Sequence, residues 1–84
     1  MSSDELRQHV QAAIREEWPA FAARHPHLAE AIEESFWIDT AADSIDSDPA
    51  YHAAMNNAQL LGTVLDQGPV IVRDFVQRWL KRLG

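Results

Sequence analysis

The chain of 84 residues is long enough for one compact domain but not for two, so we predict a single helical domain over residues 1–84. It contains no cysteine, which excludes disulfides, thiolate nucleophiles and cysteine-based zinc sites. Its formal net charge of −6 argues against nucleic acid as a partner, because cationic side chains supply most of the affinity for phosphates.

The first helix is predicted at residues 3–17, where apolar side chains recur every three or four positions. Leu6, Val10 and Ile14 would share one face of it. Pro19 lacks a backbone N–H and disfavours helical backbone at the preceding residue, so we expect it to break the helix. A short helix over residues 19–24 would follow.

His25-Pro26 predicts the next helix start, and this helix would continue to residue 46. Leu28, Ile32 and Phe36 would lie on one face of it. The triplet Phe-Trp-Ile at residues 36–38 spans about 200° of a helix, so it cannot face a single neighbour. Either two layers sandwich the helix here, or part of the triplet is exposed to a partner.

Asp48-Pro49 joins a preferred N-cap residue to a first-turn proline and predicts a helix over residues 49–66. Gly68-Pro69 is then predicted to turn the chain into an antiparallel last helix over residues 69–83. That helix has one apolar stripe, and its cationic last turn complements the helix dipole.

From these elements we predict an all-α fold. We expect a small up-and-down bundle of four helices, three long helices plus one short helix, although the sequence marks five helical segments. The residues expected in its core share the apolar faces of the predicted helices. They are Leu6, Val10, Ile14, Trp18, Phe21, Leu28, Ile32, Phe36, Tyr51, Met55, Leu61, Leu65, Val72, Phe75, Val76 and Trp79.

Two groups of side chains could in principle bind a metal ion, and neither has the required pattern. The histidines lack the Glu-x-x-His spacing of di-metal bundles, and the aspartates lack the glycine and glutamate of a calcium loop. They are His9, His25, His27 and His52, and Asp39, Asp43, Asp46 and Asp48. No nucleophile motif or phosphate-binding glycine loop is present. We therefore predict no metal, no cofactor and no enzymatic activity.

Surplus apolar side chains favour a protein–protein interaction module, either a homo-oligomer or a small adaptor for another protein. The helix stripes do not accommodate all of these side chains, and Trp37 and Trp79 would be the anchors of the interface. The expected interface residues are Phe36, Trp37, Ile38, Val70, Ile71, Trp79, Leu80 and Leu83.

Two alternatives remain open. The basic amphipathic helix at residues 69–83 could bind a membrane surface, or the histidines and aspartates could serve a small metal-binding protein or enzyme. The first residues lack the basic and apolar regions of a signal peptide, and no apolar run approaches the ~20 residues of a membrane span. The expected location is therefore the cytoplasm.

Overall fold

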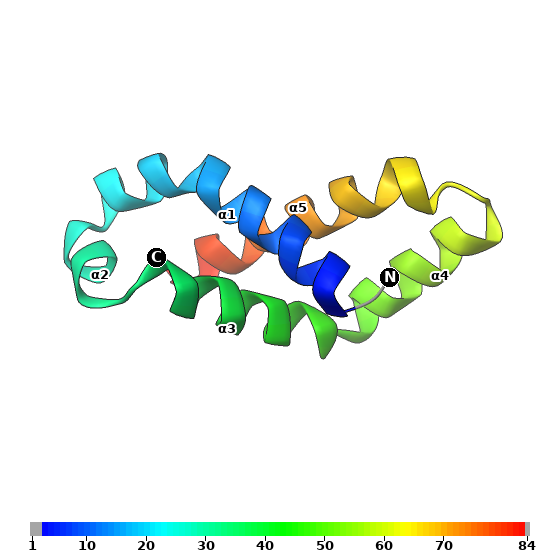
Figure 1. The fold of residues 1–84 in the computed structure, drawn as a ribbon, viewed down its shortest axis with the longest axis horizontal. Coiled ribbons are helices and arrows are strands. Elements are labelled where there is room, and N and C mark those ends of the chain that lie inside the picture. Colours follow the sequence, from blue (N-terminus) through cyan, green and yellow to red (C-terminus); the bar gives the residue numbers. More distant parts are fainter. Residues whose placement is uncertain (1–2, 84) are drawn as a thin grey trace.

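A computed structural model describes residues 3–83, which form an elongated helical molecule of 42 × 19 × 18 Å (Figure 1). No strand occurs in residues 3–83, which confirms the all-α prediction, but five helices are present where four were expected. They are α1 (Ser3–Arg24), α2 (Pro26–Ala31), α3 (Glu34–Asp46), α4 (Pro49–Leu60) and α5 (Val64–Leu83).

The helices do not alternate in direction as a simple up-and-down bundle would. In Figure 1, α3 and α4 follow one another along the long axis, and α5 returns along it. As a result α5 packs on α1, α3 and α4, while α1 packs on α2, α3 and α5. The molecule therefore has one end built from α1, α3 and the later part of α5, and another built from the α4–α5 hairpin.

Aromatic rings from three helices form the core of the first end. The ring of Trp37 in α3 lies edge-on to Phe21 of α1 and to Trp79 of α5, at centroid distances of 5.6 and 5.7 Å. Phe21 is fully buried, and Trp37 and Trp79 are nearly so. At the other end, Tyr51 of α4 packs edge-on against Phe75 of α5 at 6.0 Å.

α1 continues through Pro19, so the predicted break at this proline is wrong. Proline removes the hydrogen bond to the carbonyl of Arg15, but both residues lie on an exposed side of the helix, where water can bond that carbonyl. Trp18 packs against the core and Phe21 is within it. Burial on both sides of the proline thus keeps the helix continuous.

The predicted helix over residues 26–46 is instead two helices, because Ile32 has an extended backbone with φ −130° and ψ 129°. This break changes the rotational phase of α3 relative to α2. Trp37 and Ile38 therefore point into the core, with Ala41 and Ile45 on the following turns, and Phe36 points outwards. Only one residue of the 36–38 triplet is exposed.

The turn before the last helix lies six residues earlier than predicted, at Gly62 rather than at Gly68. α4 ends at Leu60, and Gly62 has φ +69°. The N–H of Gly62 donates to the carbonyl of Gln59 at 3.1 Å, and that of Thr63 to the carbonyl of Ala58 at 2.9 Å. This pair of bonds around a left-handed glycine is a Schellman motif. The expected N-cap is confirmed, because Asp48 accepts a hydrogen bond from the N–H of Ala50 at 2.9 Å.

Most of the predicted core is buried, and the exceptions follow from the shifted boundaries. Phe36, Leu61 and Leu65 were expected inside but are exposed. Trp18, Leu28 and Ile32 are half-buried against the core. The other predicted core residues are buried: Leu6, Val10, Ile14, Phe21, Tyr51, Met55, Val72, Phe75, Val76 and Trp79.

Candidate interaction surface

Half of the predicted interface residues belong to the core of the chain itself. Trp37, Ile38, Trp79 and Leu80 are each less than 10% exposed. The prediction that Trp37, Ile38 and Leu80 are surplus to the core is therefore wrong, whereas Trp79 lies in the core as also predicted. The break at Ile32 turns the first two inwards, and the stripe of α5 that faces α1 and α3 includes the other two.

The remaining predicted interface residues are at the surface but do not lie together. Phe36 is 56% exposed and sits beside Ile32 at the α2–α3 break. Val70 and Leu83 are exposed on α5, and Ile71 is half-buried. Val70 and Leu83 are thirteen residues apart, which corresponds to about 20 Å along a helix. These side chains do not define one contiguous patch.

Three leucines around the α4–α5 turn are the most exposed large apolar side chains in residues 3–83. Leu60, Leu61 and Leu65 are 86%, 68% and 93% exposed. We call this group the hairpin tip. In Figure 1 the turn forms the end of the molecule farthest from α2. Leu65 lies two turns before Val72 on the same face of α5, so the tip extends the stripe that is buried elsewhere in that helix.

The hairpin tip lies at the end of a stretch without formal charge. Residues 49–65 contain no Asp, Glu, Lys or Arg, although these types make up 24% of the chain. Depletion of charge beside exposed apolar side chains is typical of the centre of a protein interface. The uncharged stretch is visible in the sequence. The hairpin tip was not predicted, because a turn placed at Gly68 puts Leu61 and Leu65 in a helix and in the core.

A shallow groove of about 330 Å³ runs between α4 and α5 and reaches the hairpin tip at Leu61. Its walls combine small and apolar side chains with neutral polar ones. The lining residues are Ala54, Asn57, Ala58, Leu61, Thr63, Gln67 and Ile71. Thr63 donates from its hydroxyl to the carbonyl of Ala58 at 3.3 Å, which fixes one end of the groove.

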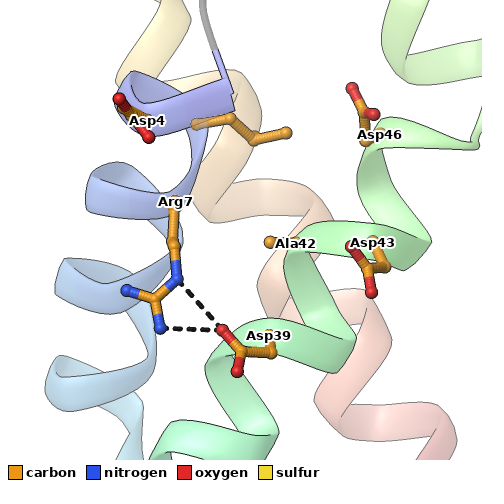
Figure 2. A pocket seen from close by; sticks show the side chains of 7 residues that line it. Asp4, Arg7, Asp39, Ala42, Asp43 and Asp46 are labelled. Carbon is orange, nitrogen blue, oxygen red and sulfur yellow. Dashed lines mark hydrogen bonds and ion pairs between the residues drawn. The ribbon is translucent and has the colours of Figure 1, made fainter.

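The predicted acidic cluster lines a different cleft, between the start of α1 and α3 (Figure 2). Asp4 on one wall and Asp39, Asp43 and Asp46 on the other line a volume of about 390 Å³. Arg7 donates from Nε and Nη2 to Oδ1 of Asp39 at 3.0 and 2.7 Å (Figure 2). This exposed ion pair across the cleft connects α1 to α3.

A third cavity, of about 370 Å³, is lined by titratable side chains that could in principle take part in a reaction. Tyr51 and His52 line it with Asp46. Burial, and secondarily the negative charge of Asp46, raise the pKa of Tyr51 above its ordinary value of 10.0. The phenol is therefore protonated at neutral pH and is not a nucleophile. His52 bonds through Nε2 to the backbone carbonyl of Asp46.

The histidines are dispersed rather than grouped. The ring of His25 packs on Phe21 at a centroid distance of 5.1 Å, and His27 is exposed. Within residues 3–83, no three His, Asp or Glu side chains are placed to hold one metal ion. The same part of the chain contains no helix with the length and apolarity needed to span a bilayer.

Neither a protein-family model, nor a curated protein, nor a solved structure matches the chain.

Proposed function

We propose that the protein is a non-enzymatic protein–protein interaction module that binds through the hairpin tip. The observation that carries this proposal is the high exposure of Leu60, Leu61 and Leu65 at the end of residues 49–65, a stretch without formal charge. The absence of enzymatic activity and a cytoplasmic location are part of the same proposal.

The energetic argument is that these leucines gain nothing within the chain alone. Burying a leucine side chain contributes about 1.5–3 kcal/mol relative to leaving it in water. The chain buries Leu6 and Leu80 but leaves all three leucines of the tip exposed. A partner that covered the tip would recover this free energy, and exposed apolar patches of this kind commonly mark binding sites.

Protein is a better-supported partner than a membrane surface. The membrane alternative requires the apolar stripe of α5 to face lipid. Val72, Phe75 and Trp79 of that stripe are buried against the other helices. The tip itself has no cations beside it to attract anionic lipid.

A photo-crosslinking side chain at position 65 tests this proposal in the cells that produce the chain. We expect a discrete adduct with another protein chain, and we expect it to disappear when Leu60 and Leu61 are both replaced by serine. A crosslinker at Phe36 is the matched control, because this residue is also an exposed apolar side chain near the start of a helix.

Two results would contradict the proposal. One is the absence of any adduct specific to position 65. The other is an adduct that persists unchanged after the double serine replacement. Trp37→Ala is not a suitable variant for this purpose, because Trp37 is 4% exposed and its loss would test the core rather than the surface.

A further inference from the structure

We infer that the partner of the hairpin tip is a second copy of this chain, bound about a two-fold axis. This inference rests on the proposed function above and adds the identity of the partner. In a two-fold contact both copies use the same surface. Residue i of the first copy then contacts residue j of the second, and residue j of the first contacts residue i of the second.

The first argument is the distribution of charge. A charged side chain near a two-fold axis meets its own like charge, which is unfavourable. The chain carries a net charge of −6, so most of its surface would repel a second copy. Residues 49–65, which form α4 and the turn with the hairpin tip, carry no formal charge, and Asp66 is the one charged residue directly beside the tip in sequence, so this face repels a second copy least.

The second argument is the chemistry of the polar groups in the α4–α5 groove. Asn57 and Gln67 each present an amide, which has both donors and an acceptor, and Thr63 presents a hydroxyl. Groups of this kind can pair with identical groups. A strongly acidic or basic partner would instead require complementary charges, which the groove does not contain.

The third argument is shape. Two antiparallel helices with an uncovered groove make half of a four-helix bundle, and a second hairpin completes it. α4 has twelve residues and is therefore about 18 Å long, and a helix pair is about 20 Å wide. A face of that size is about 360 Å² per copy, which is smaller than stable specific interfaces, so we expect a weak, transient dimer with a dissociation constant on the order of 100 μM.

Sedimentation equilibrium of the untagged full chain tests this inference between about 5 and about 500 μM. The expected mass rises from 9.5 kDa towards twice that value as concentration increases. The rise should be steeper at high salt than at low salt, because salt screens the repulsion between two copies that each carry a net charge of −6, while the contact surface has no ion pairs to weaken. Leu65→Glu should keep the protein monomeric over the same range.

Phe36→Glu is the matched control for Leu65→Glu. Both replace an exposed apolar residue near the start of a helix, add one negative charge, and place glutamate where the helix dipole favours it. Phe36→Glu should dimerise like the unmodified chain. Circular dichroism should show the same helix content for both variants.

A mass that stays at 9.5 kDa up to the highest concentration would overturn the inference of self-pairing. So would a dimer that Leu65→Glu leaves intact. Neither result removes the proposed function if a crosslinker at position 65 still captures a different chain. If that crosslinker also yields no adduct, both the inference and the proposed function fail.

Discussion

Gly62 is the residue that decides which leucines reach the surface. Its φ of +69° allows the two hydrogen bonds that end α4, and Leu60, Leu61 and Leu65 then lie around a turn instead of along a helix. No atom beyond its sequence neighbours lies within 4 Å of where a Cβ would be, so space does not select glycine here. The backbone conformation does.

Gly62→Ala should lower the free energy of unfolding by about 1–2 kcal/mol, because an L-residue is strained in the left-handed region. Urea denaturation of the purified protein measures this change. Gly62→Asn is the control and should lose less, since asparagine tolerates positive φ better than alanine. An alanine variant as stable as the unmodified protein would show that the turn does not require this conformation.

At the scale of the helix, the prolines have two different environments. Pro49 occupies the first turn of α4, where a missing N–H costs nothing and Asp48 caps the helix. Pro19 and Pro69 lie inside α1 and α5, where each removes a hydrogen bond. Core residues flank Pro19 on both sides, whereas the buried residues of α5 begin at Gly68, next to Pro69, and continue from Val72 onwards.

Pro19→Ala should therefore raise the free energy of unfolding by about 1–3 kcal/mol, since it restores a hydrogen bond and removes a steric conflict. Pro49→Ala is the control and should change stability by less than about 0.5 kcal/mol. Thermal unfolding followed by circular dichroism compares the two variants. Equal effects would contradict the difference between interior and first-turn proline.

The accuracy of the sequence predictions depended on whether the deciding interaction is local. The start of α4 was predicted correctly, because an N-cap and a first-turn proline act within a few residues. The break at Ile32 has no glycine or proline to mark it, and it arises from how α3 must turn to bury Trp37. The sequence analysis placed the turn at Gly68, which precedes a proline, whereas in the folded chain the turn is at Gly62.

The candidate surface was only partly predictable for the same reason. Periodicity correctly indicated that some apolar residues exceed what the core can hold, and Leu60 was not assigned to it. Leu61 and Leu65 continue the stripe of Tyr51 and Met55 only if the helix extends past Leu60. The six-residue shift of the turn therefore places Leu61 and Leu65 at the surface instead of in the core. Trp37 shows the opposite difference, because it was expected at an interface and is buried.

At the scale of the whole molecule, the ion pairs between helices involve α1, α3 and α5 and not α4, within residues 3–83. Ion pairs join Arg7 of α1 to Asp39 of α3, and Arg73 of α5 to Glu16 of α1. These pairs are exposed and contribute little each, but they mark the end where helices are covered on several sides. α4 has no Asp, Glu, Lys or Arg with which to form such pairs, and it is held to α5 by apolar packing.

The central claim is that two copies of the chain pair through the hairpin tip. A dilution series of ¹⁵N–¹H correlation spectra, from about 1 mM to about 20 μM, tests it residue by residue. The account predicts concentration-dependent shifts confined to residues 53–67 and to nearby α5. Shifts centred on Phe36 or on Leu83 would contradict it, and so would spectra that do not change with concentration.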